Sequence, residues 1–336
     1  MAAETTAAST GAASATTAAA QAARLLAPRR IDTRRIAIPQ PGPRQVRLRL
    51  EGCGVCASSL PVWEGRPWFS YPLEFGAPGH EPWGRVDAVG SGVTEFARGE
   101  RVTGLSYRAF ANYDLAAADH LVRLPPELDG VPVPGEPLGC AMNIVERSRI
   151  RPGESVAVIG AGFLGCLIVG LASAAGASVV ATSRRAFALH LARRCGAAEV
   201  LPWPAGPPGI AAVAQAAGEG RFDCVVEATG MQPALDLATL LVGERGRIVV
   251  AGYHQDGHRS VDMQSWNWKG IDVISAHERD SARYVSGIEA AVAAMLDGRL
   301  DPLPLLTHRV GLASLNDAFA LLHERPDGFL KAYVVN

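Results

Sequence analysis

One glycine-rich stretch, residues 156–185, constrains the fold of this chain more than any other feature. It begins with the short apolar run Val156–Ile159, which predicts a strand buried on both faces. A helix-length apolar segment follows and ends at Gly176, and a second apolar run starts at Val179. A strand, a helix and a second strand within about 30 residues predict the βαβ unit of a parallel sheet.

Three glycines in G-x-G-x-x-G spacing lie between the first strand and the helix. In this motif the first glycine permits a tight turn, the second lets the backbone approach a pyrophosphate, and the third lets helix and strand pack closely. The pyrophosphate would bind at the helix N-terminus, where N–H groups and the helix dipole favour negative charge. We therefore predict that a dinucleotide contacts Gly160, Gly162, Phe163, Leu164 and Gly165.

The length of 336 residues predicts two domains, because a single core rarely grows to this size. The formal net charge is −1, so we expect neither nucleic acid nor a membrane as a partner. No apolar run reaches the roughly 18 residues needed to span a bilayer. Six scattered cysteines are typical of reduced thiols rather than of a disulfide framework, so we expect a cytoplasmic protein.

Residues 1–23 consist almost entirely of Ala, Thr, Ser and Gly. Glu4 stands where a signal peptide would have Lys or Arg, and the stretch has no Leu-rich core. Its alanines show no amphipathic face that would dock it. We expect a disordered or frayed extension.

Short alternating segments broken by Pro and Gly begin at Ile36. Val46–Leu50 alternates strictly and predicts a half-buried strand, and Arg85–Val89 and Arg101–Thr103 predict two more. Together they predict a strand-rich, partly antiparallel domain, a small barrel.

More elements of the parallel sheet are expected after the glycine-rich unit, followed by a helix: Asp223–Gly230 (a strand and its glycine loop), Arg247–Gly252, Ile271–Ser275 and the helix Ala282–Leu296. Ligands of open α/β sheets bind outside the carboxyl ends of the strands, so we expect Thr229, Gly252 and His277 near a nicotinamide. His277 is either a substrate or proton-transfer residue or simply a polar loop residue. His254 and His258 are expected to be solvated.

Candidate metal ligands lie in three separate loops of the N-terminal half. They are Cys56 in a Gly-Cys-Gly-Val-Cys loop, His80 in Gly-His-Glu, and Glu136 in Glu-Pro-Leu. Cysteine, histidine and carboxylate ligands with one open position are typical of catalytic zinc. An inert thiol and a hydrogen-bonded histidine remain the alternative interpretation.

The cysteine loop, the Gly-His-Glu stretch, the Glu-Pro-Leu turn and the glycine-rich loop follow one another in a characteristic order. Over about Leu25–Asn336 the chain resembles the medium-chain dehydrogenase/reductases, in particular the zinc-dependent alcohol and polyol (sorbitol-type) dehydrogenases. The resemblance implies an α/β fold with a Rossmann doubly wound parallel sheet in residues 141–277. It also implies a strand-rich GroES-like barrel catalytic domain from residues 24–140 and 278–336, and a homodimer or homotetramer.

The resemblance also assigns roles in the metal site. It implies one catalytic zinc held by Cys56, His80 and Glu136. In sorbitol-type relatives the glutamate after the histidine, here Glu81, also binds zinc or alternates with a water. Cys140 lies one helical turn beyond Glu136 and is a rival ligand, although its spacing to the glycine loop is too short.

The chain departs from the family pattern near the cysteine. Ser59 stands where the family has an aspartate that orients the zinc histidine, and Pro61 stands where alcohol dehydrogenases have a histidine. Proline cannot transfer a proton, so Ser58 is the expected proton acceptor, with water or another residue as the exit. No cysteine lies between Arg85 and Arg123, so the structural zinc lobe is missing and at most one zinc is expected.

The end of the second strand of the βαβ unit bears on the choice of cofactor. Enzymes that use NAD place an Asp or Glu there, but residues 166–198 contain no acidic residue. Ser183 and Arg184 suit a ribose 2′-phosphate, which favours NADP. The alternative is that Arg184 and Arg185 cover the solvated start of a helix while NAD binds.

Five aromatic residues flank the metal loops: Trp63, Trp68, Phe69, Tyr71 and Trp83. They either wall the substrate pocket, with Trp63 as the candidate, or pack in the core.

These motifs together predict a zinc-dependent oxidoreductase that transfers a hydride between NADP(H) and a secondary alcohol or polyol, such as a sugar or cyclitol, or its ketone. A zinc-free relative of the quinone or enoyl reductase type is one alternative, favoured by the losses at Ser59 and Pro61. A non-catalytic dinucleotide-binding protein is the other.

Overall fold

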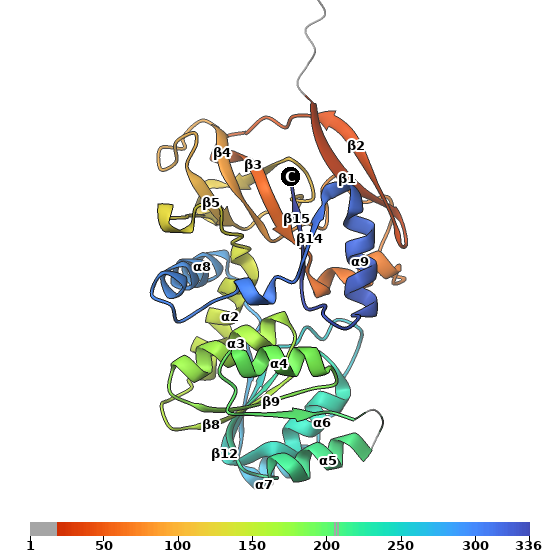
Figure 1. The fold of residues 1–336 in the computed structure, drawn as a ribbon, viewed down its shortest axis with the longest axis vertical. Helices are drawn as coiled ribbons and strands as arrows, with labels where there is room; N and C mark the ends of the chain where they lie inside the picture. The colour runs from red at the N-terminus through yellow and green to blue at the C-terminus, as the bar shows by residue number, and fades with distance from the viewer. Residues whose placement is uncertain (1–18, 205, 207) are drawn as a thin grey trace, which may run out of the picture.

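The computed structural model describes residues 19–336 except 205 and 207. Two sheets lie at opposite ends of the long axis of the molecule, a parallel sheet below and a mixed sheet above in Figure 1. Helices pack between them and around the lower sheet. The C-terminus returns to the upper sheet, so both ends of the described chain lie in the upper half (Figure 1).

The lower sheet has six parallel strands in the order β10-β9-β8-β11-β12-β13. Their bounds are β8 (Ser155–Ile159), β9 (Ser178–Ser183), β10 (Glu199–Pro202), β11 (Phe222–Glu227), β12 (Val242–Val250) and β13 (Asp272–Ser275). The direction of succession reverses between β8 and β11, and the crevice at such a switch point is where open α/β sheets bind ligands.

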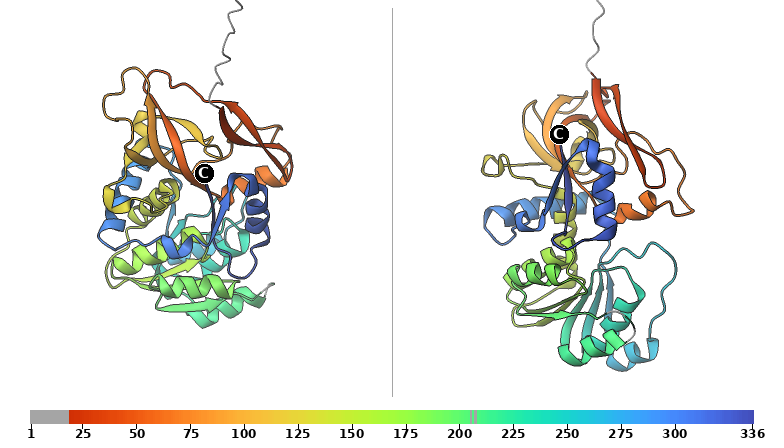
Figure 2. Two further views of the ribbon diagram at one scale, coloured as in Figure 1. Left: turned by 45° about the horizontal axis from the view of Figure 1, so that its top comes forward. Right: turned by 45° about the vertical axis from the view of Figure 1, so that its right-hand side comes forward.

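Alternate residues of β8 belong to two different cores, which explains its continuous apolar sequence. Val156 and Val158 pack with α3 and α4, whereas Ala157 and Ile159 pack with α5 and α6 on the other face. Figure 2 shows these helices on opposite sides of the strands. The bounds are α3 (Phe163–Ala174), α4 (Ala186–Arg194), α5 (Pro208–Ala217), α6 (Gln232–Leu241) and α7 (Met263–Lys269). The prediction of a strand buried on both faces is confirmed.

The upper sheet has seven strands, in the order β14-β15-β3-β4-β5-β7 with β6 paired to β3. The strands are β3 (Gln45–Gly54), β4 (Pro82–Val89), β5 (Arg101–Gly104), β6 (Tyr113–Ala117), β7 (Leu121–Arg123), β14 (His308–Gly311) and β15 (Ala332–Val335). The accompanying helices are α1 (Leu60–Glu64), α2 (Gly135–Ser148), α8 (Ser281–Leu296) and α9 (Leu315–Glu324). The predicted α/β fold class, a Rossmann sheet with a strand-rich GroES-like part, is confirmed. None of the described helices has the length and apolar character to cross a membrane.

The expectation of a frayed extension through Ala23 is wrong for residues 19–23; residues 1–18 lie outside the described part. Strand β1 (Ala19–Ala27) pairs antiparallel with β2 (Arg30–Ala37) in a separate hairpin. Ala20, Ala22 and Ala23 are buried, and the N–H of Ala23 donates to the Phe110 carbonyl at 2.8 Å. The buried side chains at the start of β1 are small, so the strand lies close against its neighbours. The low-complexity composition of residues 1–23 concealed this pattern of burial.

This packing predicts that aspartate at two adjacent positions of β1 lowers the stability of the protein by very different amounts. Ala22 is fully buried and Gln21 is exposed. In urea denaturation, Ala22→Asp should lower the free energy of unfolding by about 3 kcal/mol or more, because it buries an unpaired carboxylate. Gln21→Asp should cost less than about 1 kcal/mol. Equal losses in the two variants would show that β1 does not pack as described.

Candidate active site

Two of the three predicted metal loops meet because of the register between β3 and β4. The antiparallel pairing places Cys53 opposite Pro82, so the loop after β3 and the loop before β4 lie side by side. Ligand atoms of Cys56, His80 and Glu81 all lie within 4.8 Å of one another. Within the described part of the chain, no other group of three or more His, Cys, Asp or Glu residues is so arranged.

Glu81 is buried and uses only one of its carboxylate oxygens. Its Oε1 accepts a hydrogen bond from the Lys331 ammonium at 2.6 Å, and Lys331 is itself 4% exposed. Within the described chain its Oε2 has no hydrogen-bond partner. The carboxylate packs over Gly54, where a Cβ would lie 1.8 Å from Oε2. Because an unpaired buried carboxylate oxygen is costly, Oε2 suits a cation ligand.

His80 is held by a backbone carbonyl. Its Nδ1 lies 2.9 Å from the carbonyl oxygen of Pro78, which can only accept, so Nδ1 donates and Nε2 is the nitrogen left for a metal. The Pro78 carbonyl therefore orients the ring of His80, the role that the family assigns to an aspartate. Ser59, which stands in place of that aspartate, is buried. Burial alone would lower the pKa of His80, but the negative charges of Cys56, Glu136 and Glu81 raise that pKa to about 10. The same negative charge favours a metal cation.

Glu136 lies in the first turn of α2, at the edge of this group but not within it. Its Oε1 accepts a hydrogen bond from the Cys140 thiol at 3.4 Å, and the Cys140 sulfur lies 3.3 Å from the Tyr284 hydroxyl. Burial first, and then the charge of Glu136, raises the pKa of the Cys140 thiol well above its usual value. Cys140 donates to Glu136 and is not part of the group formed by Cys56, His80 and Glu81, so it is better placed to hold Glu136 than to replace it.

The structure places Ser58 beside the cysteine loop and Trp63 in the core. The Ser58 hydroxyl donates to the Cys56 sulfur at 3.2 Å, so it lies beside the metal loops; its part in proton transfer stays a prediction. The interpretation of Trp63 as a pocket residue is wrong. Its ring is 3% exposed and stacks on Phe319 at 5.9 Å between centroids, and its indole N–H donates to Asn316.

The predicted dinucleotide loop has the geometry that its glycines require. Gly160 has φ +105°, and its N–H donates to the Thr182 carbonyl at 2.9 Å. A Cβ on Gly165 would lie 1.9 Å from the Gly160 carbonyl oxygen, whereas a Cβ on Gly162 would meet nothing within 4 Å. No side chain caps the start of α3, so its first N–H groups remain available to an anion. Phe163 begins this helix, with the Lys331 ammonium 4.9 Å from its ring centroid.

A buried carboxylate organises the loops at the carboxyl ends of β11 and β12. Glu227 Oε1 accepts from the N–H and hydroxyl of Thr229, both at 2.6 Å, and Oε2 lies 2.9 Å from His254 Nε2. The His254 Nδ1 in turn accepts from Arg259 at 3.0 Å. The expectation that His254 is solvated is therefore wrong, because Glu227, the last residue of β11, holds its ring. His258 is exposed, as expected.

The two remaining residues predicted near the nicotinamide lie on the same edge of the sheet. The Gly252 N–H donates to the Glu227 carbonyl at 2.8 Å, which fixes the turn after β12. His277 follows β13, is exposed, and stacks on Tyr253 with 5.7 Å between ring centroids. It is not part of the group around Cys56, and its role stays a prediction.

Ser183, Arg184 and Arg185 lie at the carboxyl end of β9, as expected for the ribose end of a dinucleotide. The Arg185 N–H lies 3.4 Å from the Ser183 hydroxyl. The Arg185 guanidinium donates to the Phe329 carbonyl at 2.5 Å, so it is tied to the C-terminal segment rather than free in solvent. Arg184 is exposed.

Sequence reasoning missed Lys331, Pro78 and Glu227. Lys331 had a usable signal, because it is the one charged residue in the apolar run Phe329–Val335. A lysine in a buried strand requires an acidic partner. Nothing in the sequence identified Glu81 as that partner.

Comparison with known proteins places these observations in context. The family described as "Alcohol dehydrogenase GroES-like domain" matches residues 42–126, and "Zinc-binding dehydrogenase" matches residues 164–293. A 2-dehydro-3-deoxy-L-galactonate 5-dehydrogenase from Pseudoalteromonas atlantica is 30% identical, over 88% of this chain and 92% of that protein.

Two further proteins extend the comparison. An L-threonine 3-dehydrogenase from Rhizobium johnstonii is 27% identical, over 87% of this chain and 92% of that protein. A protein from Sinorhizobium meliloti, described as a zinc-binding dehydrogenase and solved bound to NADP, superposes with a TM-score of 0.79. It is 25% identical, and the match covers 95% of this chain and 100% of that one.

The two glycines of the loop predict distinct defects. Gly162→Ala should leave the melting temperature unchanged, because its φ is −78° and its new methyl group meets no atom of the protein. It should still weaken dinucleotide binding about tenfold or more, because the methyl blocks the approach of the pyrophosphate. Gly165→Ala should cost about 2 kcal/mol of stability through its clash with Gly160. Thermal unfolding and fluorescence titration with NADP separate the two, and a Gly162→Ala protein that binds normally would contradict the assigned site.

Proposed function

The chain belongs to the zinc-binding medium-chain dehydrogenase family of oxidoreductases, and from this premise we propose that it transfers a hydride between NADP(H) and a secondary alcohol or polyol, or the corresponding ketone. The observation that carries the proposal is the group formed by Cys56, His80 and Glu81, whose free carboxylate oxygen is buried beside the other two donors. Lys331 contacts both Glu81 and the first residue of the dinucleotide helix, so this group lies next to the expected cofactor.

The donor set fits zinc, which prefers thiolate, imidazole and carboxylate ligands. Cys56, His80 and Glu81 would hold the ion, with Glu136 as the further carboxylate at the edge of the group. When bound, zinc supplies Lewis-acid chemistry that lowers the pKa of a substrate hydroxyl. The unpaired Oε2 of Glu81 and the negative surroundings of His80 support this assignment.

The protein's own residues then have defined tasks. Ser58, hydrogen-bonded to Cys56, is the proposed acceptor of the substrate proton. Lys331 fixes Glu81, and Pro78 fixes the ring of His80. The nicotinamide, when bound, is the carrier of the hydride. Thr229, Gly252 and His277 lie at the carboxyl ends of the strands where that ring is expected, with His277 available for substrate contact.

Preference for NADP is part of the proposal. The end of β9 offers Ser183, Arg184 and Arg185 and no acidic residue that would bind a ribose 2′-hydroxyl. The NADP-bound relative from Sinorhizobium meliloti is consistent with this choice.

The proposed substrate class rests on the relatives. The two curated relatives are named for dehydrogenation at C5 of a sugar acid and at C3 of threonine, positions that bear secondary alcohols. A sugar, sugar acid or other polyol is therefore the proposed substrate. All six cysteines are free thiols, which supports the proposal of a reducing, cytoplasmic location.

Self-association through the parallel sheet is also proposed. Strand β13 is one of the two edges of that sheet, and no described strand pairs with its outer side. Unpaired edges are templates for strand addition, and apolar side chains on and near this edge are exposed, Val273 at 46% and Trp268 at 87%. A second copy related by a two-fold axis would cover the edge and make a homodimer, from which a homotetramer can be built.

Metal content and activity test the catalytic proposal together. Cys56→Ser should abolish activity and lower zinc affinity by more than the roughly 10–100-fold that follows loss of an outer-shell partner. Cys140→Ser is the matched control and should keep one zinc, because a hydroxyl still reaches Glu136. Metal analysis and the absorbance of reduced nicotinamide, across sugars, sugar acids and polyols with NADP and NAD, give the readouts.

Each alternative has its own outcome in this experiment. Full activity without stoichiometric zinc would support a zinc-free reductase. Tight NADP binding with no turnover on any alcohol or ketone would support a non-catalytic dinucleotide-binding protein. Loss of zinc in Cys140→Ser but not in Cys56→Ser would reverse the ligand assignment.

The dimer proposal predicts the effect of a charge on the sheet edge. Val273→Lys should shift the protein toward monomer in size-exclusion chromatography with light scattering, because a two-fold axis brings the two lysines together. Val89→Lys, at a similarly exposed valine of β4, is the control and should not. A dimer unaffected by Val273→Lys would place the interface elsewhere.

A further inference from the structure

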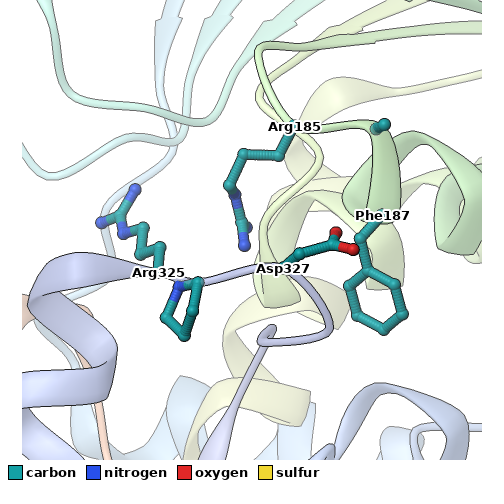
Figure 3. Close-up of a pocket in the computed structure, with 6 residues that line it drawn as sticks. Arg185, Phe187, Arg325 and Asp327 are labelled. Carbon is teal, nitrogen blue, oxygen red and sulfur yellow. The ribbon is translucent and has the colours of Figure 1, made fainter.

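A small pocket lies between the turn after β9 and the end of α9, two segments far apart in the sequence. Its lining residues are Arg185, Ala186, Phe187, Arg325, Pro326 and Asp327, and its volume is about 180 Å³. Figure 3 shows Arg185 at the start of α4 and Arg325 at the end of α9 on two sides of it. The pocket is too small for a whole dinucleotide, since ligand pockets run to about 300–1,000 Å³, and its size suits a smaller group such as a phosphate.

Two guanidinium groups, those of Arg185 and Arg325, line this pocket, and the charge of Arg184 acts on both of them. Burial first, and then the charge of Arg325, lowers the pKa of Arg185, and burial followed by the charge of Arg184 lowers the pKa of Arg325. Across residues 19–336 without 205 and 207, none of the three forms an ion pair with a carboxylate within 4.0 Å. Asp327 lines the same pocket but is not paired with them. An arrangement of like charges is unfavourable unless an anion binds among them.

Backbone carbonyls hold two of these side chains in place. Arg185 donates to the Phe329 carbonyl at 2.5 Å, and Arg325 Nε donates to the Leu322 carbonyl at 3.2 Å. Each guanidinium retains further N–H donors, which suit the oxygens of a phosphate monoester. Arg325 is also the C-cap of α9, with φ +51°, the left-handed conformation that ends many helices.

We propose that Arg325 completes the site for the ribose 2′-phosphate of NADP together with Arg184 and Arg185, so that selection of the cofactor is shared between the Rossmann sheet and the C-terminal segment. This inference rests on the proposed use of NADP. It adds a selectivity residue that lies outside the strand-end motif from which the choice of cofactor is usually read. The ligand chemistry is a phosphate dianion, carried either by the cofactor or by free phosphate.

A matched pair of variants tests the role of Arg325. Arg149 is a helix C-cap with the same φ of +51°, at the end of α2 and outside this pocket. Asparagine tolerates this backbone conformation, so Arg325→Asn and Arg149→Asn change the backbone equally. Isothermal titration of the full-length protein should show NADP binding about tenfold weaker in Arg325→Asn, with NAD binding changed less than about twofold. Arg149→Asn should bind both cofactors normally.

Ligand fragments separate the two sources of phosphate. For the wild type, 2′,5′-ADP should bind more tightly than 5′-AMP, and Arg325→Asn should remove most of that difference while Arg325→Lys restores part of it. Inorganic phosphate that binds as tightly as 2′,5′-ADP would overturn the inference in favour of a free-anion site.

Failure of the inference and failure of the proposed function give different results. If Arg184→Ala selectively weakens NADP but Arg325→Asn does not, the C-terminal segment has no part in selection, and the NADP proposal stands. An equal loss for NADP and NAD in Arg325→Asn would likewise reject a 2′-phosphate contact. If the wild type shows no preference for NADP or 2′,5′-ADP, both proposals fall.

Discussion

The contact between Lys331 and Glu81 fixes the relation between the two ends of the chain. Both side chains are withdrawn from water, and the ammonium lies 2.6 Å from the carboxylate. Removing two charges from water costs several kcal/mol for each ion, and only close pairing offsets that cost, so either residue alone would be strongly destabilising. Lys331, the residue just before β15, must therefore lie against Glu81 for this carboxylate to stay beside Cys56 and His80. The residue just before this strand is for this reason part of the proposed metal site.

This ion pair also determines which atoms are left for chemistry. It uses one carboxylate oxygen and leaves the other unpaired near the cysteine and the histidine. The ammonium lies over the ring of Phe163, at the start of the helix that is expected to bind the pyrophosphate. Charge is accordingly divided between two regions of the molecule. Negative groups surround the metal loops at one end, and arginines gather at the end of β9 at the other.

The sequence predicted those parts of the fold and site whose geometry depends on residues close together in the sequence. Gly160 and Gly165 are needed for local backbone geometry, so their spacing alone identified the loop. The role of Lys331 was not predicted because its partner Glu81 is 250 residues away in the sequence. The contact of His254 was not predicted because Glu227 lies on a distant strand. Strand β1 was not predicted because the sequence of buried alanines such as Ala22 does not differ from that of a disordered tail. Contacts between distant segments depend on packing, which hydrophobic periodicity does not encode.

The short segment after α9 connects the arginines at the end of β9 with the metal loops. Arg325 lies at its start beside Arg185, and Lys331 lies at its end beside Glu81. The Phe329 carbonyl between them accepts from Arg185, so the segment is attached to the dinucleotide-binding half as well. A phosphate bound among the arginines would relieve their repulsion and stabilise the position of this segment. A metal bound at Glu81 would stabilise the same segment from its other end. Because binding free energies are reciprocal, each ligand should then favour the other through these few residues.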